Sequence, residues 1–409
     1  MTDSTHDPAS IAASAPQAQV RRSALLETVH GAVEASGQDA GTAAHYGDPV
    51  REQRALARGG AVVDLSHKGV ICVGGPDRLS WLTTLSSQIL TGLRPGQSAE
   101  TLFLSVQGRV EFAPHVIEDG STVWLITEPQ ETQPLREWLE SMRFALRVEI
   151  EDRSRDVAVI AAVDVPEHLR VLAAEPAEGR CELIWTDPWP GVADGGWAYG
   201  EQDGHPGAQR QWHEVLVPRE KLVEAVTGPA SDGLSLAGSW AGEALRIEAW
   251  RPRLGPDTDD RTVPHELDWL RTAVHLSKGC YKGQETVARV HNLGHPPRRL
   301  VFLDLDGSEH TLPSAGAEVL AGQRKVGRVS SVQLHHEAGP IALAVIKRSV
   351  DTQAELRVRE VLESPQQVED EQAEPARSEQ WAAAQTVVVP PDAGQVVQRE
   401  SGFLRRPRH

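Results

Sequence analysis

Cysteine is scarce in this chain: its 409 residues include only Cys72, Cys181 and Cys280. These thiols lie too far apart in sequence to form a zinc or iron–sulfur nest, and a single cysteine cannot hold a cluster unaided. Their odd number and wide spacing suit free thiols in a reducing compartment. We therefore expect a cytoplasmic protein with unpaired cysteines.

Long apolar runs and an excess of basic charge are also lacking. The longest apolar runs, such as residues 341–346, fall far short of the roughly 20 residues that a membrane-spanning helix needs. The N-terminus lacks a basic stretch followed by an apolar one, so we expect no secretory signal. The formal net charge of −17 argues against non-specific nucleic-acid binding. The sequence thus predicts neither a membrane nor a nucleic acid as a partner.

Common phosphate-binding, nucleophile and metal signatures are missing as well. Residues 74–76 lack the spacing that would place several amides around a phosphate, and no elbow motif supports a serine nucleophile. His291 and His295 have the spacing of two ligands on one helix face, but Gly294 and Pro296 oppose a helix through both. Ordinary structural roles account for scattered histidines, so we expect no metal site.

The order of apolar patterns indicates the architecture. Strands and helices alternate without a regular βαβ period, which is typical of an α+β fold. Short strand-like runs beginning near residue 299 predict a small C-terminal β-barrel. We divide the chain into a disordered arm (1–44), two α+β domains (45–155 and 156–284), a barrel domain (285–389) with a mobile acidic insertion (364–380), and a tail (390–409).

The most informative stretch contains the third cysteine and reads Lys278, Gly279, Cys280, Tyr281, Lys282, Gly283, Gln284, Glu285. Residues that favour an ordered element follow, so a helix there would place Cys280 just outside its N-terminus. The helix dipole and the ammonium groups of Lys278 and Lys282 would then favour the nucleophilic thiolate. A buried cysteine in a turn is the ordinary alternative, but two nearby lysines do not suit a buried apolar thiol.

A second candidate site combines acidic and apolar residues. Alternation along a predicted strand puts Glu214 on the same face as Leu216, where a carboxylate needs a partner. Arg246, Glu248 and Arg251 cluster near the end of a predicted helix. An exposed set of salt bridges is the more frequent explanation of such a cluster. Alternatively, a carboxylate at the bottom of an apolar pocket can accept two parallel hydrogen bonds from a planar heterocycle.

The cysteine motif resembles the signature of the YgfZ-type folate-binding proteins, which are relatives of the aminomethyltransferase (T-protein) of the glycine cleavage system. Further likeness lies in segments 63–66, 75–77, 93–96 and 245–249, in the order that this superfamily uses. The resemblance implies a ring of three domains around a central pocket. It also implies that the pocket holds tetrahydrofolate or a one-carbon folate derivative.

The resemblance further implies roles for individual residues. Glu214 would bind the pterin ring, Arg246 and Glu248 would line the pocket, and Cys280 would be the reactive group. The thiol would act on a one-carbon adduct, a sulfur species or the cluster of a partner. The implied function is an accessory role in assembling or repairing iron–sulfur client proteins.

Two differences separate the chain from the T-protein pattern. The T-protein has an Asp-Asp pair after its Gly-rich turn, whereas this chain has Glu111 and Phe112 there. T-proteins also lack the cysteine motif. Both differences argue against aminomethyl transfer, which nevertheless stays open as an alternative function. A non-catalytic, folate-regulated scaffold with a structural Cys280 is the other alternative.

Overall fold

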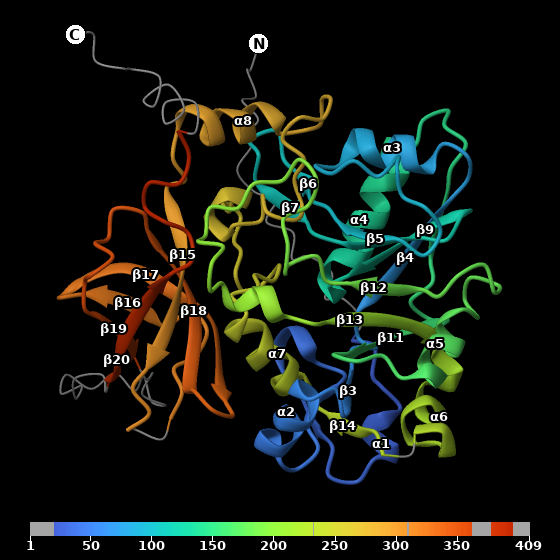
Figure 1. Ribbon diagram of the computed structural model, residues 1–409, viewed down its shortest axis with the longest axis horizontal. Coiled ribbons are helices and arrows are strands. Elements are labelled where there is room, and N and C mark those ends of the chain that lie inside the picture. Colours follow the sequence, from blue (N-terminus) through green and yellow to red (C-terminus); the bar gives the residue numbers. More distant parts are fainter. Residues whose placement is uncertain (1–19, 232, 309–310, 362–377, 396–409) are drawn as a thin grey trace, which may run out of the picture.

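The computed structural model describes residues 20–231, 233–308, 311–361 and 378–395. These residues form a mixed α/β fold in which two five-stranded sheets stand beside a closed six-stranded barrel. Figure 1 shows the barrel on the left and the two sheets, with their helices, on the right. The predicted α+β class and the C-terminal barrel are therefore confirmed.

The α-helices among the described residues are α1 (Leu25–Thr28), α2 (Pro49–Ala57), α3 (Arg78–Leu85), α4 (Pro129–Met142), α5 (Glu167–Ala173), α6 (Leu222–Thr227), α7 (Ser239–Glu248) and α8 (Gln284–Leu293). Local sequence accounts for where several of them begin. The side chain of Asp48 accepts a hydrogen bond from Arg51 N at 3.0 Å, and Pro49 occupies the first turn of α2.

The first sheet is antiparallel and has the strand order β10 (Glu149–Asp152), β4 (Gly69–Gly74), β9 (Thr122–Thr127), β8 (His115–Glu118), β5 (Ser98–Glu100). The second sheet has the order β12 (Ile184–Thr186), β13 (His213–Pro218), β11 (Val157–Ala162), β3 (Ala61–Asp64), β14 (Ser235–Ala237). Among the described strand pairs of this sheet, only β14 and β3 run parallel.

The two sheets pack face to face. Val70 and Cys72 of β4 share one apolar cluster with Val159 and Leu216 of the second sheet. The alternate residues of the same strands point outward, toward α3 and α4 on one side and α1, α5 and α6 on the other. Period-two alternation thus makes each strand contribute to two apolar layers.

The barrel closes in the order β15 (Arg298–Leu305), β18 (Gly339–Lys347), β17 (Arg324–His335), β16 (Glu318–Ala321), β19 (Leu356–Val361), β20 (Ser378–Val387). Two short ribbons complete the described strands: β1 (Val33–Glu34) with β2 (Ala43–His45), and β6 (Phe103–Leu104) with β7 (Val110–Phe112). The barrel packs on the rest of the fold through an apolar cluster that includes Leu343 and Trp269.

The prediction of a disordered N-terminal arm is wrong for residues 20–44. These residues contain α1, β1, a 3₁₀ turn at Gly37–Asp39 (η1) and the start of β2, and the side chain of Leu25 is fully buried. Composition alone indicates disorder in this segment, since it has few apolar residues. Its order comes from contacts with distant parts of the chain. Residues 1–19, most of the acidic insertion and residues 396–409 of the tail lie outside the described residues.

No helix in the described parts of the chain is both long enough and apolar enough to cross a membrane.

Candidate functional site

Glu214 lies on β13 with its side chain on the face between the two sheets, as the alternation with Leu216 predicts. The residue is 1% exposed. Its two carboxylate oxygens have separate partners: Lys68 Nζ lies 2.6 Å from Oε1, and His115 Nδ1 lies 2.8 Å from Oε2. Burial alone would raise the pKa of Glu214, but Lys68 and His115 outweigh it and hold this pKa well below its ordinary value. The carboxylate is therefore ionised.

An aromatic stack holds His115 in place beside this carboxylate. The imidazole of His115 lies parallel to the indole of Trp185, with ring centroids 3.6 Å apart and planes 3° apart. Trp185 on β12 is paired in register with Glu214 on β13. Glu214, His115 and Trp185 thus form a buried group with one planar, polar face.

A second group of charges surrounds Arg253 in the loop after α7. The Arg253 guanidinium contacts Glu128 Oε2 at 2.7 Å, Asp39 Oδ1 at 2.8 Å and Glu243 Oε1 at 2.9 Å. Lys68 Nζ lies 3.8 Å from Glu128 Oε1 and so links this group to Glu214. Desolvation would raise the pKa of Glu128, but Arg253 and Lys68 lower it to about 2.

These groups line one cavity. The atom-free space in and around it, open solvent included, is about 690 Å³. Its lining includes Lys68, His115, Trp185, Glu214, Arg246 and Arg251. The residues come from both sheets, from α7 and from the loop after it. Concave sites with a few converging polar groups are where small molecules usually bind.

Arg246 does line this cavity, but its guanidinium is already engaged. Nη1 contacts Asp257 at 2.7 Å, and Nη2 contacts Glu243 at 2.8 Å and Ser331 Oγ at 2.7 Å. Because Ser331 belongs to β17, Arg246 joins α7 to the barrel. Its contacts are those of a residue that holds the cavity together.

Glu248 lies elsewhere. Its side chain is 53% exposed, does not line the cavity and sits 3.5 Å from His335 Nε2 on β17. Glu248 lies two positions after Arg246, and a helix turns by about 200° over that distance, so the two side chains point in different directions. The structure therefore does not bring Glu248 together with Glu214 and Arg246.

Sequence reasoning missed several residues of the cavity. Lys68 sits in a four-residue turn that joins two strands, His115 begins β8, and Glu128 is the N-cap residue of α4. Nothing local in the sequence distinguishes such polar residues from surface ones. Arg251 stood out only as part of a charged cluster, although its side chain is 4% exposed and faces the cavity.

The cysteine motif folds as a loop ahead of α8, which Figure 1 places at the top of the molecule. Cys280 is exposed and is not among the residues that line the cavity. Lys278 points away into the protein, where its Nζ donates to the backbone carbonyls of Thr83, Ser86 and Gln88. Burial lowers the pKa of Lys278 to about 8. This lysine anchors the loop, so its ammonium group is committed to other partners.

The other residues of the motif also shape or pair within the loop. Lys282 Nζ lies 3.1 Å from Glu111 Oε2, and Tyr281 is buried. Gln284 Nε2 donates to the carbonyl of Lys278 at 3.0 Å, which closes the loop on itself. Glu285 pairs with Arg289 one turn along α8, 2.6 Å away.

Glu111 and Phe112, which stand where the T-protein pattern has its acidic pair, both lie outside the cavity lining. Glu111 faces Lys282. Phe112 packs against Phe103 and Trp138, with ring centroids 6.5 Å away in each case. The chain thus has no carboxylate at the second of these positions, and the first one contacts the cysteine motif.

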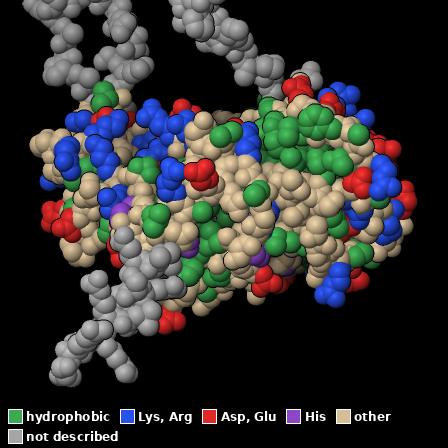
Figure 2. All heavy atoms as spheres, turned by 90° about the horizontal axis from the view of Figure 1, so that it is seen from above, with side chains coloured by type: hydrophobic (Ala, Val, Ile, Leu, Met, Phe, Trp, Pro, Cys, Tyr) green, Lys and Arg blue, Asp and Glu red, His purple; other side chains and the backbone are tan. Residues whose placement is uncertain are grey.

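The face of the molecule that carries α8 is mixed in character. Figure 2 shows hydrophobic side chains gathered near the end away from the barrel, and Lys and Arg side chains nearer the barrel. Within the described residues, no three His, Cys, Asp or Glu side chains are grouped so as to hold a metal ion.

Comparison with known proteins finds sequence similarity to aminomethyltransferases. No protein-family model matches the sequence. The aminomethyltransferase of Rippkaea orientalis is 29% identical over 321 residues, which cover 75% of this chain and 85% of that protein. The aminomethyltransferase of Streptomyces coelicolor is 26% identical over 340 residues, which cover 80% and 90%.

The structural comparison agrees. The glycine cleavage system aminomethyltransferase T from Bartonella henselae matches with a TM-score of 0.64 at 18% identity, covering 91% of this chain and 97% of that one. The chain therefore has the T-protein fold, and its sequence is similar to those of aminomethyltransferases. These findings do not separate the YgfZ-type proteins from the rest of this group.

Proposed function

We propose that this protein binds tetrahydrofolate, or a one-carbon derivative of it, in the cavity around Glu214, as a folate-dependent protein of the aminomethyltransferase type. The buried, ionised carboxylate of Glu214 carries the proposal. The T-protein fold and the similarity to aminomethyltransferases support it.

The carboxylate can accept hydrogen bonds from a pterin. A carboxylate has about four lone-pair sites, and Lys68 and His115 use one on each oxygen. The pterin ring presents two parallel donors, N3–H and the 2-amino group, and these match the remaining sites. Trp185 and His115 add a flat surface next to the carboxylate. Such contacts would orient the ring and exclude water from it.

The first candidate activity is aminomethyl transfer to folate, which the similarity to aminomethyltransferases favours. It can be measured as tetrahydrofolate-dependent release of ammonia from an aminomethylated lipoyl carrier protein. In this activity Glu214 and its neighbours would position the folate, and one of the other cavity carboxylates would have to replace the acidic pair missing at Glu111 and Phe112.

Folate binding is tested by anaerobic calorimetric titration with tetrahydrofolate. We expect Glu214→Gln to weaken binding on the order of 10- to 100-fold, because a neutral amide cannot accept at both positions. Glu248→Gln is the matched control, since it alters an exposed glutamate outside the cavity, and we expect it to bind like the wild type.

Thermal unfolding of each variant shows whether the fold is intact, because Glu214→Gln leaves Lys68 with a weaker partner. No binding by the wild type, or equal binding by a folded Glu214→Gln variant, would remove the pterin assignment.

A second candidate function follows from the exposure of Cys280. Its thiol lies outside the cavity, in a loop packed on the turn that contains Val106, an apolar residue that is 70% exposed. A thiol placed in this way suits chemistry on a partner, such as an iron–sulfur client protein, better than chemistry on the bound folate.

Cys280→Ser separates the two candidates. If the thiol serves partners, this variant keeps the wild-type affinity for tetrahydrofolate and lowers iron–sulfur enzyme activity in the host. Unchanged enzyme activity with Cys280→Ser, together with a loss in Glu214→Gln, would instead indicate a folate-regulated scaffold with a structural cysteine.

A further inference from the structure

Within the described structure, Arg251, which lines the cavity, keeps one guanidinium nitrogen without a hydrogen-bond partner. Its Nη2 donates to Glu100 Oε1 at 2.7 Å, and its Nε lies 3.3 Å from Asp187 Oδ1. Its Nη1 is shielded from solvent and has no hydrogen-bond partner among the described residues. Because buried donors are nearly always bonded in native proteins, this nitrogen is available to an acceptor from outside the chain.

The guanidinium is held rigidly. Glu100, its main partner, also accepts hydrogen bonds from Trp269 Nε1 at 2.9 Å and from Thr272 Oγ1 at 2.5 Å. The Arg251 guanidinium also lies over the ring of Trp189, 4.9 Å from its centroid. Because Nη2, Nε and one face of the Arg251 guanidinium are held by neighbours, its remaining nitrogen, Nη1, points in a single direction.

The anions that bind Arg251 lie close to Trp185, the neighbour of Glu214 in the sheet. Asp187, which binds Arg251 Nε, lies two residues beyond Trp185, the residue paired with Glu214 in register. The carbonyl of residue 99, next to Glu100, accepts the Trp185 indole N–H at 2.8 Å. The two anions that fix Arg251 therefore flank the same tryptophan that stands beside Glu214.

We propose that Arg251 selects the 4-oxo form of the pterin ring by donating from Nη1 to the oxygen on C4. This proposal rests on the proposed binding of folate at Glu214. In a pterin the 4-oxo group adjoins N3–H, so a ring held by Glu214 through N3–H and the 2-amino group presents an acceptor beside its two donors. One carboxylate and one guanidinium then bond all three polar groups along this edge of the ring: the 2-amino group, N3–H and the 4-oxo group.

A 4-amino pteridine lacks this pattern. Its C4 substituent is a donor, and a guanidinium has only donors, so the two groups would face each other without a hydrogen bond. Its N3 also carries no hydrogen, so Glu214 would lose one of the two donors that it accepts from. A site built to bond one polar group rejects an analogue that leaves its own group unpaired. Arg251 would therefore add to the discrimination that Glu214 makes between two ligands of nearly equal size, and the loss of preference in an Arg251 variant measures its share.

Two other polar groups of the cavity differ from Arg251 in their bonding. Ser239 Oγ also lacks a partner within the described structure, but a hydroxyl can rotate to donate or accept. Arg210 is engaged through Nε with Asp187 Oδ2 at 2.7 Å and through Nη1 with the carbonyl of Leu245.

The test compares tetrahydrofolate with its 4-amino analogue, tetrahydroaminopterin, by anaerobic titration calorimetry on the full chain. We expect the wild type to bind tetrahydrofolate on the order of 10- to 100-fold more tightly than the analogue. Arg251→Lys keeps a positive charge for Glu100 and Asp187 but loses the planar guanidinium. We expect the preference of this variant for tetrahydrofolate over the analogue to fall at least fivefold. Glu248→Gln, which alters a residue outside the cavity, should keep the wild-type preference.

Each outcome decides between the proposals. Equal affinity of the wild type for both compounds overturns the role of Arg251, whatever the stability of any variant. An unchanged preference in Arg251→Lys does so too. No binding of either compound by the wild type overturns folate binding itself, and the selection by Arg251 with it.

Discussion

At the scale of single residues, burial decides which charges this protein can use. Glu131, in the first turn of α4, is nearly inaccessible and accepts hydrogen bonds from the backbone N–H groups of Ala113 and Glu128 at 2.7 and 2.8 Å. Burial outweighs these two donors and raises the pKa of Glu131 to about 8. Ala113 and Glu128 line the cavity, so a proton on Glu131 affects the lining directly.

We predict that Glu131 makes the protein less stable as the pH rises, and that Glu131→Gln reduces this pH dependence. The pKa of Glu131 in the folded protein is about 8, above its ordinary value of 4.5. Between these two pH values the folded protein therefore binds more protons than the unfolded protein does. This contribution is fully present below pH 4.5 and is lost as the pH rises through 8. Between pH 6 and pH 8 the wild type should lose roughly 1 to 3 kcal/mol more of its unfolding free energy than Glu131→Gln does.

Urea unfolding at several pH values measures both proteins. Because histidines also titrate in this range, only the difference between wild type and variant is informative. Equal slopes against pH would mean that Glu131 is ionised in the fold.

At the scale of elements, glycines let the cysteine motif pack closely on the turn between β6 and β7. Gly283, just ahead of α8, has a φ of +85°, and a Cβ there would lie 2.5 Å from the carbonyl oxygen of Ser105. Gly108, in the facing turn, has a φ of +74° and no room for a Cβ beside Thr286. The order of this loop therefore depends on two glycines that face each other from distant parts of the chain.

We predict that Gly283→Ala destabilises the protein by about 1 to 3 kcal/mol, because alanine is strained at positive φ and would clash with backbone. Gly279→Ala in the same motif is the matched control, since a Cβ there meets nothing within 4 Å. Its effect should stay within about 0.5 kcal/mol. Chemical denaturation measures both, and equal effects would contradict this account of the loop.

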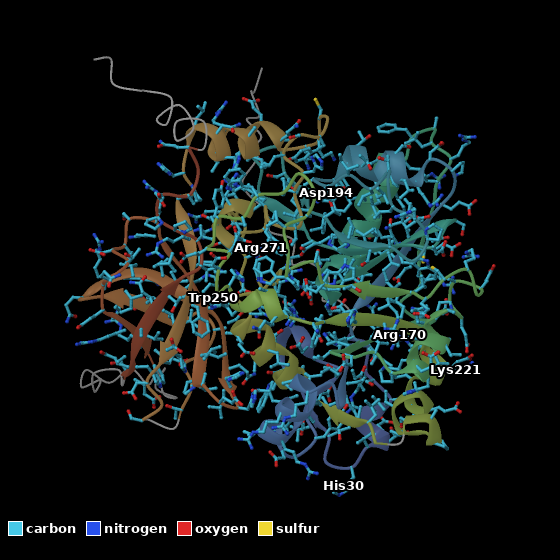
Figure 3. The ribbon with its side chains drawn as sticks, in the orientation of Figure 1. His30, Arg170, Asp194, Lys221, Trp250 and Arg271 are labelled. Carbon is cyan, nitrogen blue, oxygen red and sulfur yellow. The ribbon has the colours of Figure 1, made fainter. Side chains whose placement is uncertain are left out.

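At the scale of the whole molecule, a few arginines join the barrel to the sheets. Arg298, at the start of β15, contacts Asp259 Oδ2 at 2.5 Å and Glu266 Oε2 at 2.8 Å, and Arg246 reaches Ser331 on β17. Trp250, which Figure 3 shows beside the barrel, packs against Phe302 of β15 with ring centroids 6.3 Å apart. These contacts fix the loop that carries Arg251 and Arg253 and so position one side of the cavity.

The cavity draws on residues from Asp39 to Trp269, that is, on most of the chain before the barrel. Asp39 comes from the segment that composition alone marked as disordered. It pairs with Arg253 and lies 3.2 Å from His67 Nε2. A segment with few apolar residues is ordered here because it supplies a charge that a buried arginine requires.

Sequence by itself determined the local features of this protein. Short apolar runs separated by turn residues indicated the C-terminal barrel, and strand alternation put Glu214 on an inward face. These properties depend on neighbours within a few residues, and local propensity and periodicity report them directly.

Only the tertiary structure decided which charges meet. Lys68, His115 and Trp185 reach Glu214 across separations of up to 146 residues, while Glu248 turns outward although it lies only two residues from Arg246. Lys278 likewise binds carbonyls about 190 residues away and leaves Cys280 exposed on its own. The partner of a buried charge is set by packing between distant segments, and one sequence carries no local record of that pairing.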